Sequence, residues 1–137
     1  MTPIVVDCSV FLAWCLADED EPMATAAIRR VAEMGGVVPQ IWWYELRNAL
    51  LVNERRGRIT VQQVSDTLAD SVALGIEIVP EHDEATILGF ARQHSLTVYD
   101  AAYLEVAFRR GLPLATLDRR MSAAAAEIGI TVIDAQA

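Results

Sequence analysis

Lysine is absent from this sequence, because all 11 of its basic residues are arginines. The absence excludes mechanisms that need a catalytic lysine, such as those of haloacid-dehalogenase-like phosphatases and of response-regulator receiver domains. Cysteine is scarce as well, with only Cys8 and Cys15. Two cysteines so close together make neither a disulfide framework nor a four-ligand zinc site, so we expect core residues in a reducing compartment.

Long hydrophobic runs are also missing. The longest apolar stretch, Val10 to Ala17, is far shorter than the roughly 20 residues that a membrane helix needs, and Asp7 interrupts any signal-peptide pattern. We therefore expect a cytoplasmic protein with no membrane partner. The formal charge of −8 argues against nonspecific coating of nucleic acid, which depends on phosphate neutralisation by basic residues. Any contact with nucleic acid must be local.

The chain is long enough for one compact core, since it has 137 residues of which 53% are hydrophobic. We expect a single domain over residues 1–137. Strand candidates alternate with helical patterns, which predicts an α/β fold with a parallel five-stranded sheet flanked by helices on both faces. The acidic run at 18–21, before Pro22, predicts a solvated turn. The expected strands are 4–7, 36–38, 76–79, 113–116 and 131–133, and the expected helices are 9–16, 22–34, 41–56, 61–74, 83–94, 100–110 and 119–128.

Four acids lie where a solvated surface acid would not normally be found. Asp7 and Asp118 each close an apolar strand candidate, whereas Glu45 and Asp100 lie on largely apolar helical faces. We call these four residues the acidic quartet. Carboxylates are rarely buried unless they are paired, hydrogen-bonded or bound to metal. If the fold brings the quartet together, its mutual repulsion calls for a cation, and oxygen ligands suit Mg²⁺ or Mn²⁺.

Simpler explanations remain for each acid alone. Asp100 could be a helix N-cap or a first-turn acid, and Asp7 and Asp118 could belong to strand-ending turns. Ser9 and Thr116, each two residues from a strand-end aspartate, could hydrogen-bond a carboxylate or a metal-bound water. Equally, Ser9 could be a helix N-cap and Thr116 an ordinary strand residue.

Four segments together resemble the PIN-domain ribonucleases, and more narrowly the VapC-type toxins of bacterial toxin–antitoxin pairs. The similarity extends over essentially the whole chain, and its motifs occur in the expected order. These segments are Val5-Val6-Asp7-Cys8-Ser9, Tyr44-Glu45-Leu46-Arg47-Asn48-Ala49-Leu50, Leu96-Thr97-Val98-Tyr99-Asp100-Ala101-Ala102-Tyr103-Leu104 and Leu114-Ala115-Thr116-Leu117-Asp118.

The resemblance implies a Mg²⁺- or Mn²⁺-dependent endoribonuclease that forms a homodimer and is neutralised by a small cognate antitoxin. It makes Asp7, Glu45, Asp100 and Asp118 the catalytic and metal-binding acids, and Thr116 matches a hydroxyl often found before the last aspartate. In chemical terms, Asp7 and Asp100 would hold one ion directly. Asp118 and Glu45 would complete its shell through water or hold a second ion.

Other surface features leave alternatives open. Arg55, Arg56, Arg109 and Arg110 are best explained as helix C-terminal charges, while Arg119 and Arg120 could attract RNA. His82 and His94 flank one expected helix and are interpreted as surface or capping residues. The run Trp42-Trp43-Tyr44 cannot face one core entirely, so part of it could meet a partner. The alternative function is therefore a catalytically weak or inactive binding module that docks a protein through its acidic pocket.

Overall fold

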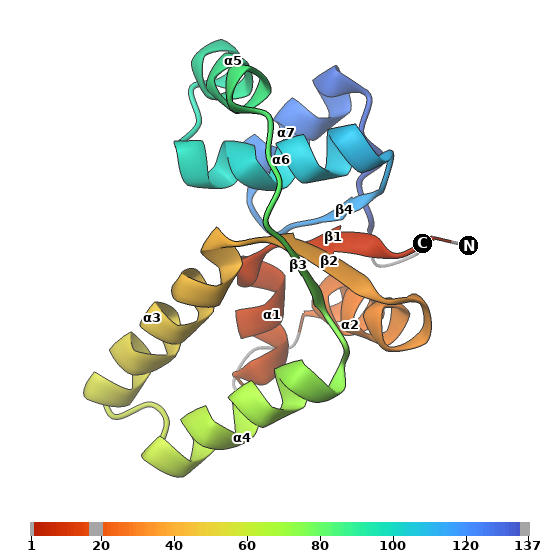
Figure 1. Ribbon diagram of the computed structural model, residues 1–137. Coiled ribbons are helices and arrows are strands. Elements are labelled where there is room, and N and C mark those ends of the chain that lie inside the picture. The colour runs from red at the N-terminus through yellow and green to blue at the C-terminus, as the bar shows by residue number, and fades with distance from the viewer. Residues whose placement is uncertain (1, 17–20, 135–137) are drawn as a thin grey trace.

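Four short parallel strands form the central sheet in the order β3-β2-β1-β4 (Figure 1). The structure is a computed structural model that describes residues 2–16 and 21–134, so most of the acidic run at 18–21 lies outside the described residues. The strands are β1 (Ile4–Val6), β2 (Gly36–Pro39), β3 (Glu77–Val79) and β4 (Leu114–Ala115). All three residues of β1 are completely buried, because helices cover both faces of a parallel sheet.

Helices cover the sheet on both faces, as the sequence predicts. In Figure 1, α1 and α2 lie below the sheet, and α5, α6 and α7 lie above it. Helix α2 contacts β1 from its side, and α6 contacts β1 and β2 from the other. Helices α3 and α4 contact each other and extend away from the sheet. The helices are α1 (Cys8–Cys15), α2 (Pro22–Met34), α3 (Ile41–Arg55), α4 (Val61–Ala73), α5 (Glu84–His94), α6 (Val98–Arg110) and α7 (Arg119–Ile128).

The expected fifth strand is not formed within the described residues. The segment at 131–133 makes a single parallel bridge, between Leu114 and Val132. Two backbone hydrogen bonds accompany it, from the Leu114 N–H to the Thr131 carbonyl at 2.8 Å and from the Ile133 N–H to the Leu114 carbonyl at 2.9 Å. β4 has only two residues, and the next residue directs its hydroxyl to Asp7. The prediction of five strands is therefore wrong, because β4 offers too short an edge for a longer ladder.

Three helix starts also differ from the sequence prediction. Helix α5 begins one residue later than expected, at Glu84, because Asp83 is its N-cap. The other two are α1 and α6. Asp7, not Ser9, is the N-cap of α1. Helix α6 begins at Val98 with Thr97 as its N-cap, so Asp100 is the third helical residue. Both expected helices thus begin earlier than predicted, since Asp7 and Thr97 provide the side-chain oxygen that accepts the first free N–H groups.

The strand order reverses between β1 and β4. The chain first adds β2 and then β3 on one side of β1, and later adds β4 on the other side. In open parallel sheets, the crevice beyond the carboxyl ends of the strands at such a reversal is the usual place for a ligand. Asp7 follows β1 directly, and Thr116 follows β4. No helix in the described part of the chain is long and apolar enough to cross a membrane.

Candidate active site at the carboxyl ends of β1 and β4

Asp7 is held by three hydrogen-bond donors at the start of α1. It is only 4% exposed. Its Oδ1 accepts from the Ser9 hydroxyl at 2.5 Å and from the Val10 backbone N–H at 3.3 Å. Its Oδ2 accepts from the hydroxyl of Thr116. With donors on both oxygens, the carboxylate has a fixed orientation.

The two hydroxyls also connect α1 to the segment between β4 and α7. Each donates to Asp7 and accepts a backbone N–H from that segment: the Leu117 N–H donates to Ser9 Oγ at 3.2 Å, and the Asp118 N–H donates to Thr116 Oγ1 at 3.0 Å. Both side chains therefore bond a carboxylate, one of the two possibilities open from the sequence. Their role toward a metal-bound water stays a prediction.

Glu45 reaches the site from α3 and is half-buried. Its Oε1 accepts a hydrogen bond of 2.5 Å from the hydroxyl of Tyr103, which lies on α6. Tyr103 is 1% exposed. The bond therefore joins two helices that are far apart in the sequence.

Asp100 and Asp118 both lie at helix N-termini. The backbone N–H of Asp100 donates to the Thr97 hydroxyl at 3.0 Å in the first turn of α6. Asp118 is the N-cap of α7, and its Oδ1 accepts from the backbone N–H groups of Arg120 and Met121 at 2.8 and 3.2 Å. Of the two simpler explanations for Asp100, the first-turn position is the one observed, and Asp118 caps α7 where the sequence suggested a strand-ending turn. Neither position prevents a second role, because the helix dipole stabilises a carboxylate there without engaging all of its lone pairs.

Electrostatic effects link the four acids in a chain. Burial raises the pKa of Glu45, and the charges of Asp100 and Asp7 raise it further, while the Tyr103 hydrogen bond lowers it in part. Burial also raises the pKa of Asp100, with a further rise from the charge of Asp118. The pKa of Asp7 is raised by its burial against the opposing effect of its hydrogen bonds. The fold thus brings Asp100 and Asp7 near enough to Glu45, and Asp118 near enough to Asp100, for the charge of one acid to oppose the charge of the next.

Residues 4–127 match the family profile described as the PIN domain, which covers the strand ends, the acidic quartet and the two hydroxyls. The chain belongs to the PIN-domain family. This result confirms the resemblance seen in the sequence and the α/β class of the fold.

Several known proteins are similar to this PIN domain. Ribonuclease VapC3 of Pyrobaculum aerophilum is 30% identical over 123 residues, which cover 87% of this chain and 92% of that protein. The crystal structure of PAE2754 from Pyrobaculum aerophilum superposes with a TM-score of 0.73 at 26% identity, over 96% of this chain and 83% of that one. FitAcB from Neisseria gonorrhoeae has a TM-score of 0.59 at 17% identity, over 97% of this chain and 98% of its own, and supports the fold alone.

The donor set of the PIN domain suits a hard divalent cation, since the quartet offers only carboxylate oxygens. Among residues 2–16 and 21–134, no three acidic, histidine or cysteine side chains converge closely enough to form a ready-made ligand cluster. Three of the four acids instead accept hydrogen bonds from protein groups: Asp7 from two hydroxyls, Glu45 from Tyr103 and Asp118 from its own helix. Burial raises the pKa values of Glu45 and Asp100 most, and a cation would offset the smaller rise that comes from neighbouring carboxylates.

The sequence does not predict the role of Tyr103, and it leaves two roles open for Arg120. Tyr103 occupies an apolar helical face, which is typical of a core aromatic, yet its hydroxyl bonds Glu45. Its position one turn after Asp100 on the same helix is the only signal that points to it. For Arg120 the sequence leaves surface charge and RNA contact both open. Its Nη2 donates to the Ser95 carbonyl at 2.7 Å, and its charge lowers the pKa of Asp100.

Arg109, Arg110 and His94 make contacts within the scaffold. Arg109 and Arg110 lie in the last turn of α6, as predicted, and also form ion pairs with Glu105 at 2.6 Å and with Glu77 at 3.0 Å. His94 Nδ1 lies 3.3 Å from Glu127 Oε2. These contacts tie α6 to β3 and α5 to α7.

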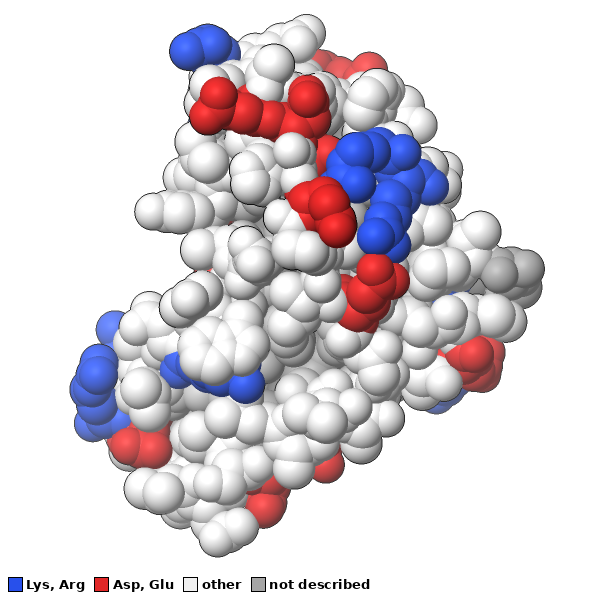
Figure 2. Space-filling model, in the orientation of Figure 1, with Lys and Arg blue, Asp and Glu red and all other residues white. Residues whose placement is uncertain are grey.

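The aromatic run on α3 divides between core and surface. Trp42 is 3% exposed, whereas Trp43 and Tyr44 are 42% and 65% exposed. Trp43 contacts Tyr44 edge to face, with ring centroids 5.0 Å apart, and the Arg47 guanidinium lies 3.8 Å from the Trp43 ring centroid. On the face drawn in Figure 2, the surface is hollowed between the α5–α6 layer and α3, and the hollow is largely uncharged. The partly exposed arrangement is therefore the one observed.

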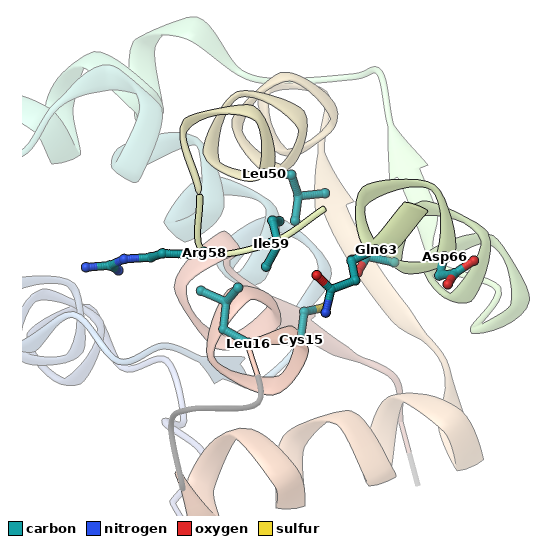
Figure 3. Close-up of a pocket in the computed structure, with 8 residues that line it drawn as sticks. Cys15, Leu16, Leu50, Arg58, Ile59, Gln63 and Asp66 are labelled. Atoms are coloured by element: carbon teal, nitrogen blue, oxygen red, sulfur yellow. The ribbon is translucent and has the colours of Figure 1, made fainter. Parts of the chain in front are cut away.

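A separate cavity of about 460 Å³ lies among α1, α3, α4 and the turn between α3 and α4. Figure 3 shows Leu16, Leu50 and Ile59 gathered at its centre, with the side chain of Arg58 extending away from it. None of the acidic quartet lines this cavity. It is therefore distinct from the candidate active site.

Proposed function

We propose that this PIN domain is a Mg²⁺- or Mn²⁺-dependent endoribonuclease and the toxin of a VapBC-type toxin–antitoxin pair. The observation that carries the proposal is the position of Asp7 and Thr116 just beyond the ends of β1 and β4, where the strand order reverses, with Asp7 also close enough to Glu45 for its charge to raise the pKa of that acid beyond the effect of burial. The 30% identity with Ribonuclease VapC3 over most of both chains supports the same activity.

Each residue of the site has a role in this proposal that follows from its position. Asp7 and Asp100 would hold a divalent ion, and Asp118 and Glu45 would complete its shell through water or hold a second ion. When bound, such an ion activates a water for attack on the phosphodiester and neutralises charge that develops on the phosphoryl oxygens. Ser9 and Thr116 fix the orientation of Asp7 through their hydroxyls. Arg120, whose charge reaches Asp100, attracts the RNA backbone.

A cleavage assay with purified protein tests the proposal. We expect total cellular RNA to be cut at discrete sites with Mg²⁺ or Mn²⁺, and EDTA to abolish the cuts. Asp7→Asn should remain folded and inactive, because the amide loses the charge that a cation needs. Asp83→Asn is the matched control, since Asp83 is an exposed aspartate that also caps a helix. Unchanged cleavage by Asp7→Asn would remove Asp7 from the mechanism.

Two protein partners belong to the same proposal. A second copy of the chain forms a homodimer, which light scattering would detect as twice the 15.0 kDa of one chain. A small antitoxin neutralises the enzyme, and a basic segment of it could enter the acidic pocket by charge complementarity. A complex with intact antitoxin that left the quartet open to solvent would contradict that mode of inhibition.

The binding module remains the second candidate, because Trp43 and Tyr44 expose aromatic surface near the site. Absence of cleavage by a folded, metal-bound, antitoxin-free protein would favour it over the ribonuclease.

A further inference from the structure

The hydrogen bond between Tyr103 and Glu45 joins a buried phenol to a carboxylate of the candidate site. The donor–acceptor distance is 2.5 Å, and the two residues are 58 positions apart in the sequence. Tyr103 is 1% exposed, whereas Glu45 is half-buried. The buried Tyr103 hydroxyl is therefore in place to hold the partly solvated Glu45 carboxylate.

Glu45 needs such an anchor more than Asp7 and Asp118 do. Asp7 and Asp118 have short side chains and accept backbone N–H groups at the start of their helices. The glutamate side chain has three rotatable bonds, and its only hydrogen bond given by the structure is the one from Tyr103. The charges of Asp100 and Asp7 oppose its carboxylate. Without the phenol, repulsion would favour rotamers that turn Glu45 toward water.

Helix α6 also supplies Asp100, one turn before Tyr103. One rigid helix thus carries an acid of the quartet and the residue that holds another acid. Such a hydrogen bond behind a ligand typically fixes the ligand's orientation. A phenol could also bond a carboxylate only to satisfy its own buried O–H, and the test below distinguishes the two roles.

We propose that Tyr103 is a positioning residue whose hydroxyl holds the Glu45 carboxylate beside Asp7 and Asp100, in place to complete the divalent-ion site. This inference rests on the proposed metal-dependent ribonuclease function and extends it to a residue outside the acidic quartet. Tyr103→Phe removes the hydroxyl and keeps the buried ring. Tyr44→Phe is the matched control, because Tyr44 is 65% exposed and makes no hydrogen bond that the structure gives.

The first measurement is Mn²⁺ binding by titration calorimetry, which needs no RNA cleavage. We expect Tyr103→Phe to weaken Mn²⁺ binding by about 10- to 100-fold, the usual effect of losing an outer partner of a metal ligand. Tyr44→Phe should bind as the wild type does. Far-ultraviolet circular dichroism, which reports helix content, should be unchanged in both variants. Wild-type Mn²⁺ affinity in a folded Tyr103→Phe protein would overturn the proposal.

The second measurement is a double-mutant cycle on RNA cleavage with Glu45→Gln. If Tyr103 acts through Glu45, Tyr103→Phe should lower kcat about 10- to 100-fold in the wild-type background, with KM for RNA nearly unchanged, and have little effect once Glu45 is glutamine. Losses that multiply in the double variant would show independent action and overturn the proposal. Failure of the wild type to cleave RNA would reject the proposed function, and the Mn²⁺ comparison would still decide the role of Tyr103.

Discussion

Replacement of Thr116 by valine tests the hydroxyl that joins both sides of the site. Thr116→Val keeps the β-branched shape at a buried position and removes one oxygen. Asp7 then loses a hydrogen bond to its buried carboxylate, and the Asp118 N–H loses its acceptor. Because the shape is preserved, no cavity opens and the effect reports the hydrogen bonds.

The expected loss of stability follows from these two bonds. A hydrogen bond to a charged group contributes about 1.5–3 kcal/mol, and a donor left without a partner costs about 1–3 kcal/mol. Asp118 is only half-buried, so water can replace part of its loss. We expect the free energy of unfolding to fall by roughly 2–4 kcal/mol, which a domain of typical stability, about 5–15 kcal/mol, survives.

Urea unfolding followed by tryptophan fluorescence at pH 7 measures this loss. Thr86→Val is the matched control, because Thr86 donates a 2.5 Å hydrogen bond to Asp83 in an exposed position. The Thr116 bond lowers the pKa of Asp7 and so favours the charged form. The difference between wild type and Thr116→Val should therefore shrink as the pH falls and Asp7 becomes protonated. A loss at pH 7 no greater than that of Thr86→Val, or a difference independent of pH, would refute this reasoning.

Three further perturbations address charge, metal and scaffold. The pKa values of Glu45 and Asp100 are raised above the ordinary 4.5 and 3.8. The stability that their protonated forms contribute is therefore present below those values and lost as the pH rises through the folded pKa values. In EDTA, the free energy of unfolding in urea should fall toward pH 7, and it should fall less in Asp100→Asn. Mn²⁺ at about 100 times its Kd should raise the free energy of unfolding by about 2.7 kcal/mol, measured by thermal unfolding, and Asp7→Asn should abolish the rise. Arg109→Met leaves the 1%-exposed Glu105 without its ion pair and should cost about 2–4 kcal/mol in urea unfolding, somewhat below the 3–5 kcal/mol of a fully buried pair.

Specific results would contradict each of these three predictions. A flat stability profile in EDTA would contradict the role of repulsion among the acids. An equal rise with Mg²⁺ or Mn²⁺ in wild type and Asp7→Asn would place the ion elsewhere. Arg110→Met should change stability by no more than about 1 kcal/mol, since its partner Glu77 is exposed. A loss as large as that of Arg109→Met would remove the distinction between buried and exposed pairs.

The sequence predicts the strand-end positions well because their physics is local. An apolar run that ends in an acid already tells which end of the strand carries the carboxylate, so Asp7 can be placed directly after β1, and Asp118 after β4 with two residues between them. The α/β class follows from the same alternation of short apolar runs with helical patterns. These features depend on neighbours in the sequence.

The helix starts are wrong by only one or two residues for local capping reasons, whereas the larger failures depend on partners farther away in the chain. Tyr103 looks like a core residue, and only its contact with Glu45 reveals its hydroxyl as a donor. The segment at 131–133 has the composition of a strand, but the strand that it meets is only two residues long. Side-chain composition cannot reveal the length of the edge that a segment will meet.

The pairing of β1 with β4 has a consequence for synthesis on the ribosome. Thr116 and Asp7 are 109 residues apart, and Leu114 of β4 pairs with Val5. A nascent chain that has not yet reached Thr116 therefore lacks both Asp118 and the Thr116 hydroxyl that helps to orient Asp7. At about 5–20 residues per second, the polypeptide stays incomplete for several seconds. If the chain is the ribonuclease proposed here, it cannot cut the messenger RNA from which it is being translated until most of its own length has emerged.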